Sequence, residues 1–372
     1  MRVFFSTGEP SGEYHAVELA SAMRRQFGGA IECEGIGAQR MRDAGFRVVF
    51  DNRGWASLGW IEALAKIPSL LAIMLVTALR LRLRPPDLIV LVDFGAFNLR
   101  LARQLRRTGY RGSIVYYIPP GAWLDRTKAA HMVAKATTPL TVFTHQRDFY
   151  AGLGLHAEFF GHPLASLIPQ RAPRPAPPPD AGVVAILPGS RRAEIERHMR
   201  PLLGAARGFA LERPRLEFVL SAANADVRAL IEEHVARTPG VKLRVVDGAR
   251  AALDLADAAW IASGTAVLEA ALLGVPSVLF YVTSETQARM ARRMYAKLGG
   301  KWIGLPNLVL QRSVIPELWQ ENATPSALVE ELRKILLDPS EQLAQLAGLR
   351  AALGPPDALD QIAAFVVAQA RS

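Results

Sequence analysis

The chain has 372 residues, a formal net charge of +10 and a single cysteine, Cys33. This length is enough for two domains of ordinary size, and one cysteine excludes a disulfide framework and any multi-cysteine metal site. The charge favours an anionic partner such as a phosphorylated molecule or an anionic membrane, or reflects arginines spread over solvated faces. Because zinc-finger spacing and alternating basic and aromatic residues are both lacking, we expect no nucleic-acid partner.

In the first half of the chain, short apolar segments alternate with helical patterns. Strands are predicted at 3–6, 32–35, 88–92, 114–117 and 140–143, and helices at 16–25, 61–82, 99–107 and 126–134. Continuous apolar strands that alternate with helices are typical of parallel sheets covered on both faces. Because the N-terminal residues read as a strand, we expect no cleavable signal and a protein of the reducing cytoplasm.

A proline-rich segment, 169–180, separates this half from a second one and is predicted to be an extended linker. Beyond it, strands are predicted at 183–187, 217–220, 242–246, 258–262 and 277–280. We therefore predict an α/β fold with two doubly wound, Rossmann-like domains, 1–168 and 181–340, that face each other across a cleft. The helices of 341–372 either complete the second domain or cross back to the first.

Two turns in the second half join an apolar strand to a helix and are made of small residues. The first turn consists of Ser263, Gly264 and Thr265, and Glu269 lies in the helix that follows it. The second consists of Gly189, Ser190 and Arg191, and Glu194 lies in the helix that follows it. Backbone N–H groups in such turns can approach a phosphate, and a helical carboxylate such as Glu269 can bind ribose hydroxyls. One turn alone is ordinary connection chemistry, but two of them predict a diphosphate clamp.

Asp93 directly follows the strand at 88–92, at the carboxyl edge where ligands bind in this architecture. As a general base it would take a proton from an attacking hydroxyl. The alternative is that Asp93 caps a helix that begins at Leu99. Asn98 is able to donate to a sugar hydroxyl or to the Asp93 carboxylate.

A second turn joins the first strand to the first helix and faces the same cleft. It contributes Gly8, Glu9, Ser11 and Gly12, of which Glu9 and Ser11 bind substrate unless Ser11 merely caps the helix. His162 is the one histidine placed near the cleft. With the histidines scattered and no Asp-x-Asp triplet present, we expect no metal, so that Arg191, backbone amides and helix dipoles meet the diphosphate charge. The dinucleotide fingerprint is also absent, and no cofactor is expected.

The segment 58–84 contains an uncharged stretch, 67–79, that would span roughly 20 Å as a helix. This is short of the roughly 30 Å hydrocarbon core of a bilayer, so the segment is not a transmembrane span. It is either a buried core helix or an interfacial one. In the second case its membrane contacts would be Leu70, Leu71, Met74, Leu75, Leu79, Arg80, Arg82 and Arg84.

Seven motifs occur in an order that resembles the lipid-A-disaccharide synthase family. They begin at Gly8, Asp93, Tyr117, Gly161, Leu187, Ala262 and Leu305, and read GEPSG, DFGAFN, YIPPGAW, GHP, LPGSR, ASGT and LPNL. The resemblance implies a GT-B glycosyltransferase that joins UDP-2,3-diacylglucosamine to 2,3-diacylglucosamine 1-phosphate, inverts the anomeric carbon and releases UDP. It also implies a C-terminal domain for the nucleotide, an N-terminal domain for the acylated acceptor, and a peripheral position on the cytoplasmic face of the inner membrane.

By the same resemblance, the essential acid falls on Asp93, the donor-binding arginine on Arg191, the ribose-binding glutamate on Glu269 and the motif asparagine on Asn307. Trp123 is placed with the acceptor.

The chain departs from the family at Glu13, Ala96 and Leu124, where many members have Asp, Asp and Trp, so the acyl chains accepted stay open. The alternatives are a UDP-N-acetylglucosamine 2-epimerase, an enzyme of this architecture with another lipid acceptor, or a non-catalytic nucleotide-sugar binding relative. The oligomeric state is open, with a homodimer among the options.

Overall fold

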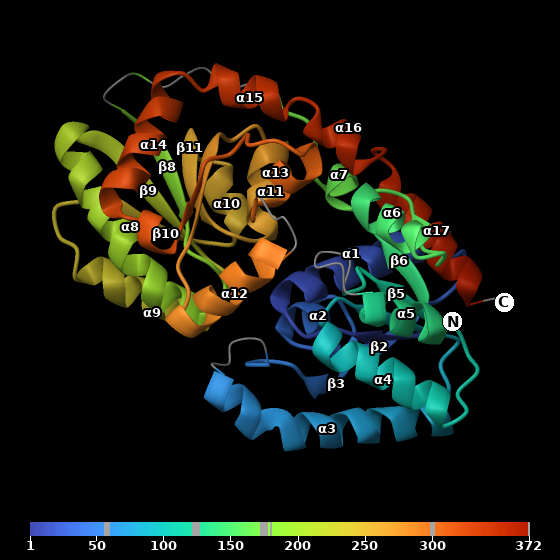
Figure 1. Ribbon diagram of the computed structural model, residues 1–372. Coiled ribbons are helices and arrows are strands. Elements are labelled where there is room, and N and C mark those ends of the chain that lie inside the picture. The colour runs from blue at the N-terminus through green and yellow to red at the C-terminus, as the bar shows by residue number, and fades with distance from the viewer. Residues whose placement is uncertain (56–59, 121–126, 172–177, 179–180, 298–301, 371–372) are drawn as a thin grey trace. The chain divides into compact units, whose positions relative to one another are not determined.

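The computed structural model describes residues 1–55, 60–120, 127–171, 178, 181–297 and 302–370. The chain divides into two compact units (Figure 1). Unit 1 comprises Met1–Leu167 together with Leu353–Ser372, and unit 2 comprises Ile168–Ala352. Most of the expected linker, residues 172–177 and 179–180, lies outside the described residues.

Unit 1 is built on a seven-stranded sheet in the order β3-β2-β1-β4-β5-β6-β7, and all of its neighbouring strands are parallel. The strands are β1 (Arg2–Ser6), β2 (Glu32–Gly37), β3 (Arg47–Asp51), β4 (Leu88–Val92), β5 (Ile114–Tyr117), β6 (Thr138–Thr141) and β7 (Glu158–Phe159). The helices are α1 (Pro10–Gln26), α2 (Gln39–Asp43), α3 (Trp60–Leu83), α4 (Gly95–Arg107), α5 (Thr127–Ala136), α6 (Thr144–Gly152) and α7 (Leu164–Leu167).

Unit 2 repeats this arrangement with a six-stranded parallel sheet in the order β10-β9-β8-β11-β12-β13. Its strands are β8 (Ala181–Leu187), β9 (Arg215–Ala222), β10 (Leu243–Asp247), β11 (Ala258–Ala262), β12 (Ser277–Tyr281) and β13 (Glu317–Trp319). Its helices are α8 (Arg192–Glu212), α9 (Ala225–Ala236), α10 (Ala249–Leu253), α11 (Thr265–Leu272), α12 (Glu285–Lys297), α13 (Leu305–Leu310), α14 (Pro325–Leu337) and α15 (Ser340–Leu346). The short helix α16 (Leu349–Leu353) also belongs to unit 2 except for its last residue, at which unit 1 resumes.

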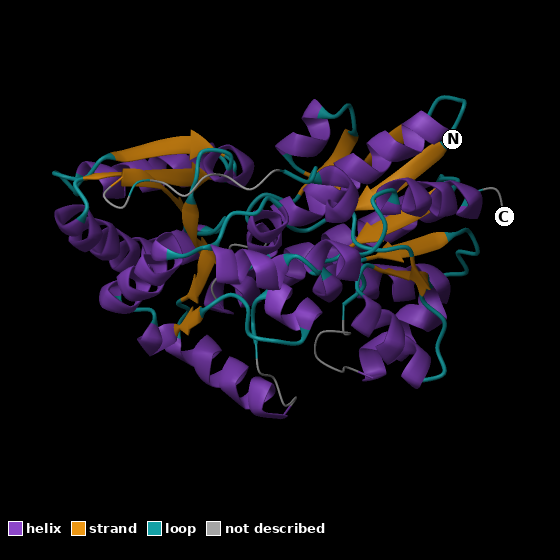
Figure 2. Ribbon diagram, turned by 90° about the horizontal axis from the view of Figure 1, so that it is seen from above, coloured by secondary structure: helices purple, strands orange, loops and turns teal. Residues whose placement is uncertain are grey.

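In each unit the strands lie between helices (Figure 2). The central strands β4 and β11 are buried along their whole length, as expected when helices cover both faces of a parallel sheet. The strand order reverses between β1 and β4 in unit 1 and between β8 and β11 in unit 2. The predicted α/β class with two doubly wound sheets is confirmed, and ligands bind at such switch points.

The C-terminal helix α17 (Ala358–Gln369) belongs to unit 1, where it packs on α1 and α7. A close backbone approach fixes this return. A Cβ added to Gly354 would lie 2.7 Å from the Gly161 α-carbon, and the His162 N–H donates to the Leu353 carbonyl at 2.7 Å. In the first turn of α17, Asp360 forms an exposed ion pair with Arg25 of α1.

The structure extends or adds several elements relative to the sequence prediction. Helix α1 begins at Pro10 rather than Ala16, and α4 begins at Gly95 rather than Leu99. The strands β3, β7 and β13 were not predicted. Two of them, β7 and β13, have two and three residues, which are too few for a hydrophobic pattern. Both lie at the edges of their sheets.

Candidate active site

At the switch point of unit 1, strand β4 ends in two consecutive residues with left-handed backbone. These are Asp93, with φ of 47°, and Phe94, with φ of 48°. On the neighbouring strand, Ile118 directly follows β5 and has φ of 59°. Left-handed backbone costs a non-glycine residue about 1–2 kcal/mol, and such residues cluster at active sites. The backbone therefore marks this edge of the sheet as a candidate site.

The Asp93 carbonyl accepts hydrogen bonds from two buried side chains. The Asn98 amide nitrogen and the Tyr116 hydroxyl each lie 2.9 Å from it. The Asn98 amide nitrogen also lies 3.1 Å from the carbonyl oxygens of Ser6 and Val92, so its two N–H groups are shared among three carbonyls, and its oxygen accepts the Ser6 hydroxyl at 2.6 Å. Asn98 is fully buried, so it supports the Asp93 turn rather than reaching a sugar, which corrects the expectation from sequence.

Asp93 itself is half-buried and precedes helix α4. The N-cap residue of this helix is Phe94, without a side-chain hydrogen bond. The alternative interpretation of Asp93 as the residue that caps the helix at Leu99 is therefore wrong. Asp93 belongs to the turn at the carboxyl end of the sheet, the edge where ligands bind in this architecture.

The turn between β1 and α1 packs directly against Phe94. A Cβ on Gly8 would lie 2.0 Å from the Phe94 ring carbon Cγ, so this position requires glycine. Gly12 is buried in the first turn of α1. The helix begins at Pro10 with Glu9 as the N-cap residue, so Ser11 lies within the helix and is not its cap.

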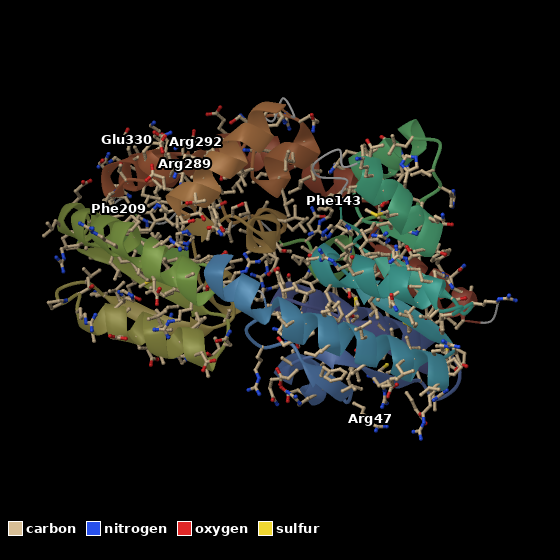
Figure 3. The ribbon with its side chains drawn as sticks, turned by 60° about the horizontal axis from the view of Figure 1, so that its bottom comes forward. Arg47, Phe143, Phe209, Arg289, Arg292 and Glu330 are labelled. Carbon is tan, nitrogen blue, oxygen red and sulfur yellow. The ribbon has the colours of Figure 1, made fainter. Side chains whose placement is uncertain are left out.

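His162 lies inside unit 1, against a cluster of rings at the ends of β5 and β6. Its ring centroid is 4.8 Å from Phe143, labelled in Figure 3, and 6.0 Å from His15. Its Nδ1 accepts the Leu164 N–H at 3.1 Å. Burial lowers the pKa of His15 to about 4 and holds the pKa of His162 well below its usual value, so both are neutral at pH 7. His162 is thus a core residue rather than a surface that substrate reaches.

Glu13, to which the sequence analysis gave no role, is a buried carboxylic acid in the first turn of α1. Burial raises its pKa, although hydrogen bonds from the backbone of Ala38 and Met41 oppose the shift. Among the described residues, its Oε2 has no hydrogen-bond partner. Buried acids with perturbed pKa values gather at functional sites, and the signal was missed because these backbone donors belong to a different part of the chain.

At the switch point of unit 2, the predicted phosphate turn is occupied by a carboxylate of the protein. Glu194 Oε2 accepts the backbone N–H groups of Ser190 and Arg191, both at a long 3.3 Å. Its Oε1 accepts the Arg191 guanidinium at 3.0 Å and the Tyr281 hydroxyl at 3.2 Å. Gly189 has φ of 114°, a conformation that favours glycine. The turn therefore brings together backbone N–H groups and a guanidinium that are able to bind an anion, and in this structure they bind the Glu194 carboxylate.

A buried histidine that the sequence analysis did not identify ties this turn to strand β12. His198 Nδ1 lies 2.7 Å from the Pro188 carbonyl, and its Nε2 accepts the Val282 N–H at 3.0 Å. Burial lowers the pKa of His198 and keeps the ring neutral. A neutral imidazole has one donor and one acceptor nitrogen, which suits a bridge between a carbonyl and an N–H.

The second predicted phosphate turn follows β11. The Ser263 N–H donates to the Phe280 carbonyl at 3.1 Å, Gly264 is exposed, and α11 begins at Thr265. Glu269 is half-buried one turn further along this helix. These four residues stay candidates for the nucleotide.

Asn307 is fully buried and does not line a surface. Its oxygen accepts the N–H groups of Val314 and Ile315 at 2.8 and 2.9 Å, and its nitrogen donates to the Ile315 carbonyl and to Glu317, both at 2.8 Å. With the amide used in this way, Asn307 holds the segment before β13 in place. This corrects the expectation that it binds the donor.

Helix α3 lies along the outside of unit 1 (Figure 1), and Figure 3 shows this helix with its described side chains drawn. One side packs into the core and includes Met74, which the sequence analysis placed among the membrane contacts. Arg80, another of those residues, pairs with Glu34 at 2.8 Å. Leu70 is half-buried and Arg82 is exposed. Six large apolar side chains are 46% to 71% exposed: Ile67, Leu71, Leu75, Val76, Leu79 and Leu83.

The remaining expectations concern Trp123 and a metal. Trp123 lies outside the described residues. Within the described ranges, no three His, Cys, Asp or Glu side chains are grouped as a metal ion would need. No helix of the described part of the chain is long and apolar enough to cross a membrane.

Comparison with known sequences gives one consistent result. A family model described as lipid-A-disaccharide synthetase matches residues 3–351. A lipid-A-disaccharide synthase from Anaeromyxobacter dehalogenans (strain 2CP-C) is 32% identical over 376 residues, which covers 98% of this chain and 97% of the relative. One from Pseudomonas aeruginosa (strain UCBPP-PA14) is 35% identical over 354 residues, which covers 92% of this chain and 91% of the relative.

Solved structures share the fold at low sequence identity. A UDP-GlcNAc 2-epimerase from Neisseria meningitidis bound to UDP-GlcNAc has a TM-score of 0.64 and 11% identity, and covers 99% of this chain and 100% of its own. Spinosyn forosaminyltransferase has a TM-score of 0.55 and 17% identity, and covers 99% of each chain. At these identities the likeness shows the fold alone, and it extends to epimerases and glycosyltransferases alike.

The neutral histidines of unit 1 predict a loss of stability in acid. The folded pKa of His15, about 4, is below the ordinary value of 6.5, so the unfolded chain binds more protons between these values. Its contribution to stability is complete above pH 6.5 and is lost as the pH falls toward 4, by about 3 kcal/mol. We expect His15→Leu to remove much of this pH dependence in urea unfolding measured at pH 7, 6 and 5. The exposed His131 supplies the control, since His131→Leu keeps the wild-type dependence. Equal slopes in both variants would contradict the prediction.

Proposed function

We propose that this chain, which belongs to the lipid-A-disaccharide synthase family, is an inverting glycosyltransferase that builds the lipid A disaccharide. The donor is UDP-2,3-diacylglucosamine and the acceptor is 2,3-diacylglucosamine 1-phosphate. The products are the disaccharide 1-phosphate and UDP. The observation that carries the proposal is the family match over residues 3–351, which spans both units and both switch points.

The reaction we propose is a direct displacement. The Asp93 carboxylate takes the proton of the acceptor 6-hydroxyl, whose oxygen then attacks the anomeric carbon of the donor. The new C–O bond forms as the bond to the UDP oxygen breaks, and the electron pair leaves with UDP. This requires a base at the acceptor and fixed positive charge or N–H dipoles at the leaving group.

We assign the acceptor to unit 1 and the nucleotide to unit 2. Unit 1 offers Asp93 together with Glu9, the N-cap residue of α1, and Ser11 in the first turn of that helix. Unit 2 offers the Arg191 turn at the N-terminus of the 21-residue helix α8, where the helix dipole favours an anion. A diphosphate would take over the two N–H groups that Glu194 now accepts at 3.3 Å, a length at which hydrogen bonds are weak. We assign the ribose hydroxyls to Glu269, which lies one helical turn beyond the Ser263–Thr265 turn.

The epimerase alternative has less support. Structures of 2-epimerases share the fold at 10–13% identity, whereas the synthases share 32–35% of the sequence. An epimerase would convert UDP-N-acetylglucosamine without a second substrate. Incubation with that compound alone distinguishes the two reactions.

Asp93→Asn is expected to lower turnover about 10²- to 10⁴-fold, because general-base assistance is worth that much. The backbone carbonyl and its two donors are retained, so the fold and the affinity for UDP should not change. The assay is formation of the tetraacyl disaccharide phosphate in mixed micelles, followed by mass spectrometry, with EDTA present. Turnover at the wild-type rate would remove Asp93 from the mechanism.

Arg191→Ala is expected to weaken UDP binding on the order of tenfold to a hundredfold, since a charge-assisted hydrogen bond contributes about 1.5–3 kcal/mol. Titration calorimetry with UDP measures this. The adjacent Arg192 is exposed and pairs with Glu196, so Arg192→Ala is the matched control and should bind UDP like the wild type. If both variants bind equally well, Arg191 does not belong to the donor site.

We further propose that the protein is peripheral on the cytoplasmic face of the inner membrane and that α3 is its contact. Both substrates are acylated, so the enzyme has to meet them at a lipid surface. The exposed apolar side chains of α3 continue into Arg82 and Arg84, which are also exposed. Apolar side chains beside cations suit an anionic lipid interface.

Leu75→Glu combined with Leu79→Glu is expected to reduce binding to vesicles that contain anionic phospholipid at least tenfold. Each leucine contributes about 1.5 kcal/mol or more when it leaves water, and the added negative charge opposes the surface potential. Flotation with vesicles gives the bound fraction. Leu211 on α8 of unit 2 is 81% exposed, and Leu211→Glu serves as the control. Equal binding by both variants would place the membrane contact elsewhere.

A further inference from the structure

We propose that Tyr116 is a positioning residue for this reaction: with Asn98, its hydroxyl holds the Asp93 peptide in the left-handed conformation that aims the carboxylate at the acceptor. The inference rests on the proposed function in that it takes Asp93 to be the base. Tyr116 lies on β5, and its side chain reaches the turn after the neighbouring strand β4.

The strained turn at Asp93 and Phe94 needs stabilising contacts from residues outside it. Two consecutive left-handed residues, Asp93 and Phe94, cost about 2–4 kcal/mol together at the usual cost per residue. Two hydrogen bonds to the Asp93 carbonyl contribute about 1 kcal/mol each, and leaving that carbonyl without them would add a desolvation cost. The bonds and the strain are therefore of similar size, so the loss of one donor is enough to change the preferred conformation.

The Tyr116 hydroxyl differs from two other tyrosine hydroxyls of the same core in having a hydrogen-bond partner within the described part of the chain. Tyr116, Tyr110 and Tyr150 all belong to the buried cluster of unit 1. Among the described residues, the hydroxyls of Tyr110 and Tyr150 have no hydrogen-bond partner, whereas that of Tyr116 lies 2.9 Å from the Asp93 carbonyl. Burial also raises the pKa of Tyr116 well above its usual value, which keeps the hydroxyl protonated and able to donate.

Packing around the turn restricts how it can relax. A Cβ on Gly8 would lie 2.0 Å from the Phe94 ring, and a Cβ on Gly95 would lie 2.6 Å from the Pro120 Cβ. Phe94 is also flanked by Trp55, at 6.0 Å between ring centroids. With Gly8 and Trp55 beside the Phe94 ring, we expect the turn to relax by a concerted change of φ and ψ at Asp93. This change would carry the Asp93 carbonyl away from its two donors, which therefore oppose it, and it would turn the Asp93 side chain away from its present direction.

The test compares Tyr116→Phe with Tyr150→Phe, each of which deletes one buried hydroxyl from the same core. We expect Tyr116→Phe to lower kcat about tenfold or more, since a displacement near 1 Å can cost a hundredfold, with KM for the UDP-sugar unchanged. Tyr150→Phe should stay within about twofold of the wild-type kcat. Equal kcat values in the two variants would overturn the proposal.

Crystal structures of both variants give a readout that does not depend on activity. In Tyr116→Phe we expect the backbone at Asp93 to leave the left-handed region, and in Tyr150→Phe to keep it. A Tyr116→Phe crystal with Asp93 still left-handed and unmoved overturns the proposal whatever its turnover. If the wild type makes no disaccharide, the proposed reaction fails, and the two crystal structures still decide whether Tyr116 positions Asp93.

Discussion

In a parallel sheet every strand ends at the same edge, and the backbone groups there lose the partners that the ladder supplied. The chain must turn into a helix at this point, and buried side chains have to form hydrogen bonds with the backbone N–H and carbonyl groups that the turn leaves without a partner. In unit 1 the Asn98 amide does so for the carbonyls of Ser6, Val92 and Asp93. In unit 2 the Glu194 carboxylate does so for the N–H groups of Ser190 and Arg191. The same constraint therefore shapes both candidate sites.

The side chains that bind these backbone groups differ in charge, since Asn98 is neutral and Glu194 is a carboxylate, and this difference affects ligand binding. A neutral amide can remain in place while chemistry occurs beside it, because it does not compete for a ligand. A carboxylate on anion-binding N–H groups does compete, so the diphosphate that we propose for unit 2 would have to displace Glu194 or share its donors. The neutral His198 holds the turn on the other side, between Pro188 and Val282, through contacts that do not involve Glu194.

Sequence reasoning succeeded where the physical signal is local. The strands at 88–92 and 258–262 were predicted with the bounds that the structure has, because five apolar residues buried on both sides leave a continuous pattern. The roles of Asn98 and Tyr116 could not be predicted, since Ser6 is 92 positions from Asn98, and Tyr116 is 23 from Asp93. An asparagine in a motif looks the same whether its amide faces a ligand or the core. Short edge strands such as β7 leave no pattern at all.

Helix α3 shows why an apolar segment cannot be divided into its two sides from sequence alone. Met74 and Leu75 are adjacent and chemically similar, yet one is buried and the other 46% exposed. The division is set from outside the helix, by the Arg80–Glu34 ion pair with β2 and by packing against the core. Since these contacts already hold the helix on unit 1, the fold does not require leucines on its outer side. Exposed apolar side chains there are costly in water unless a partner covers them, and this cost is the physical reason for proposing a lipid surface as that partner.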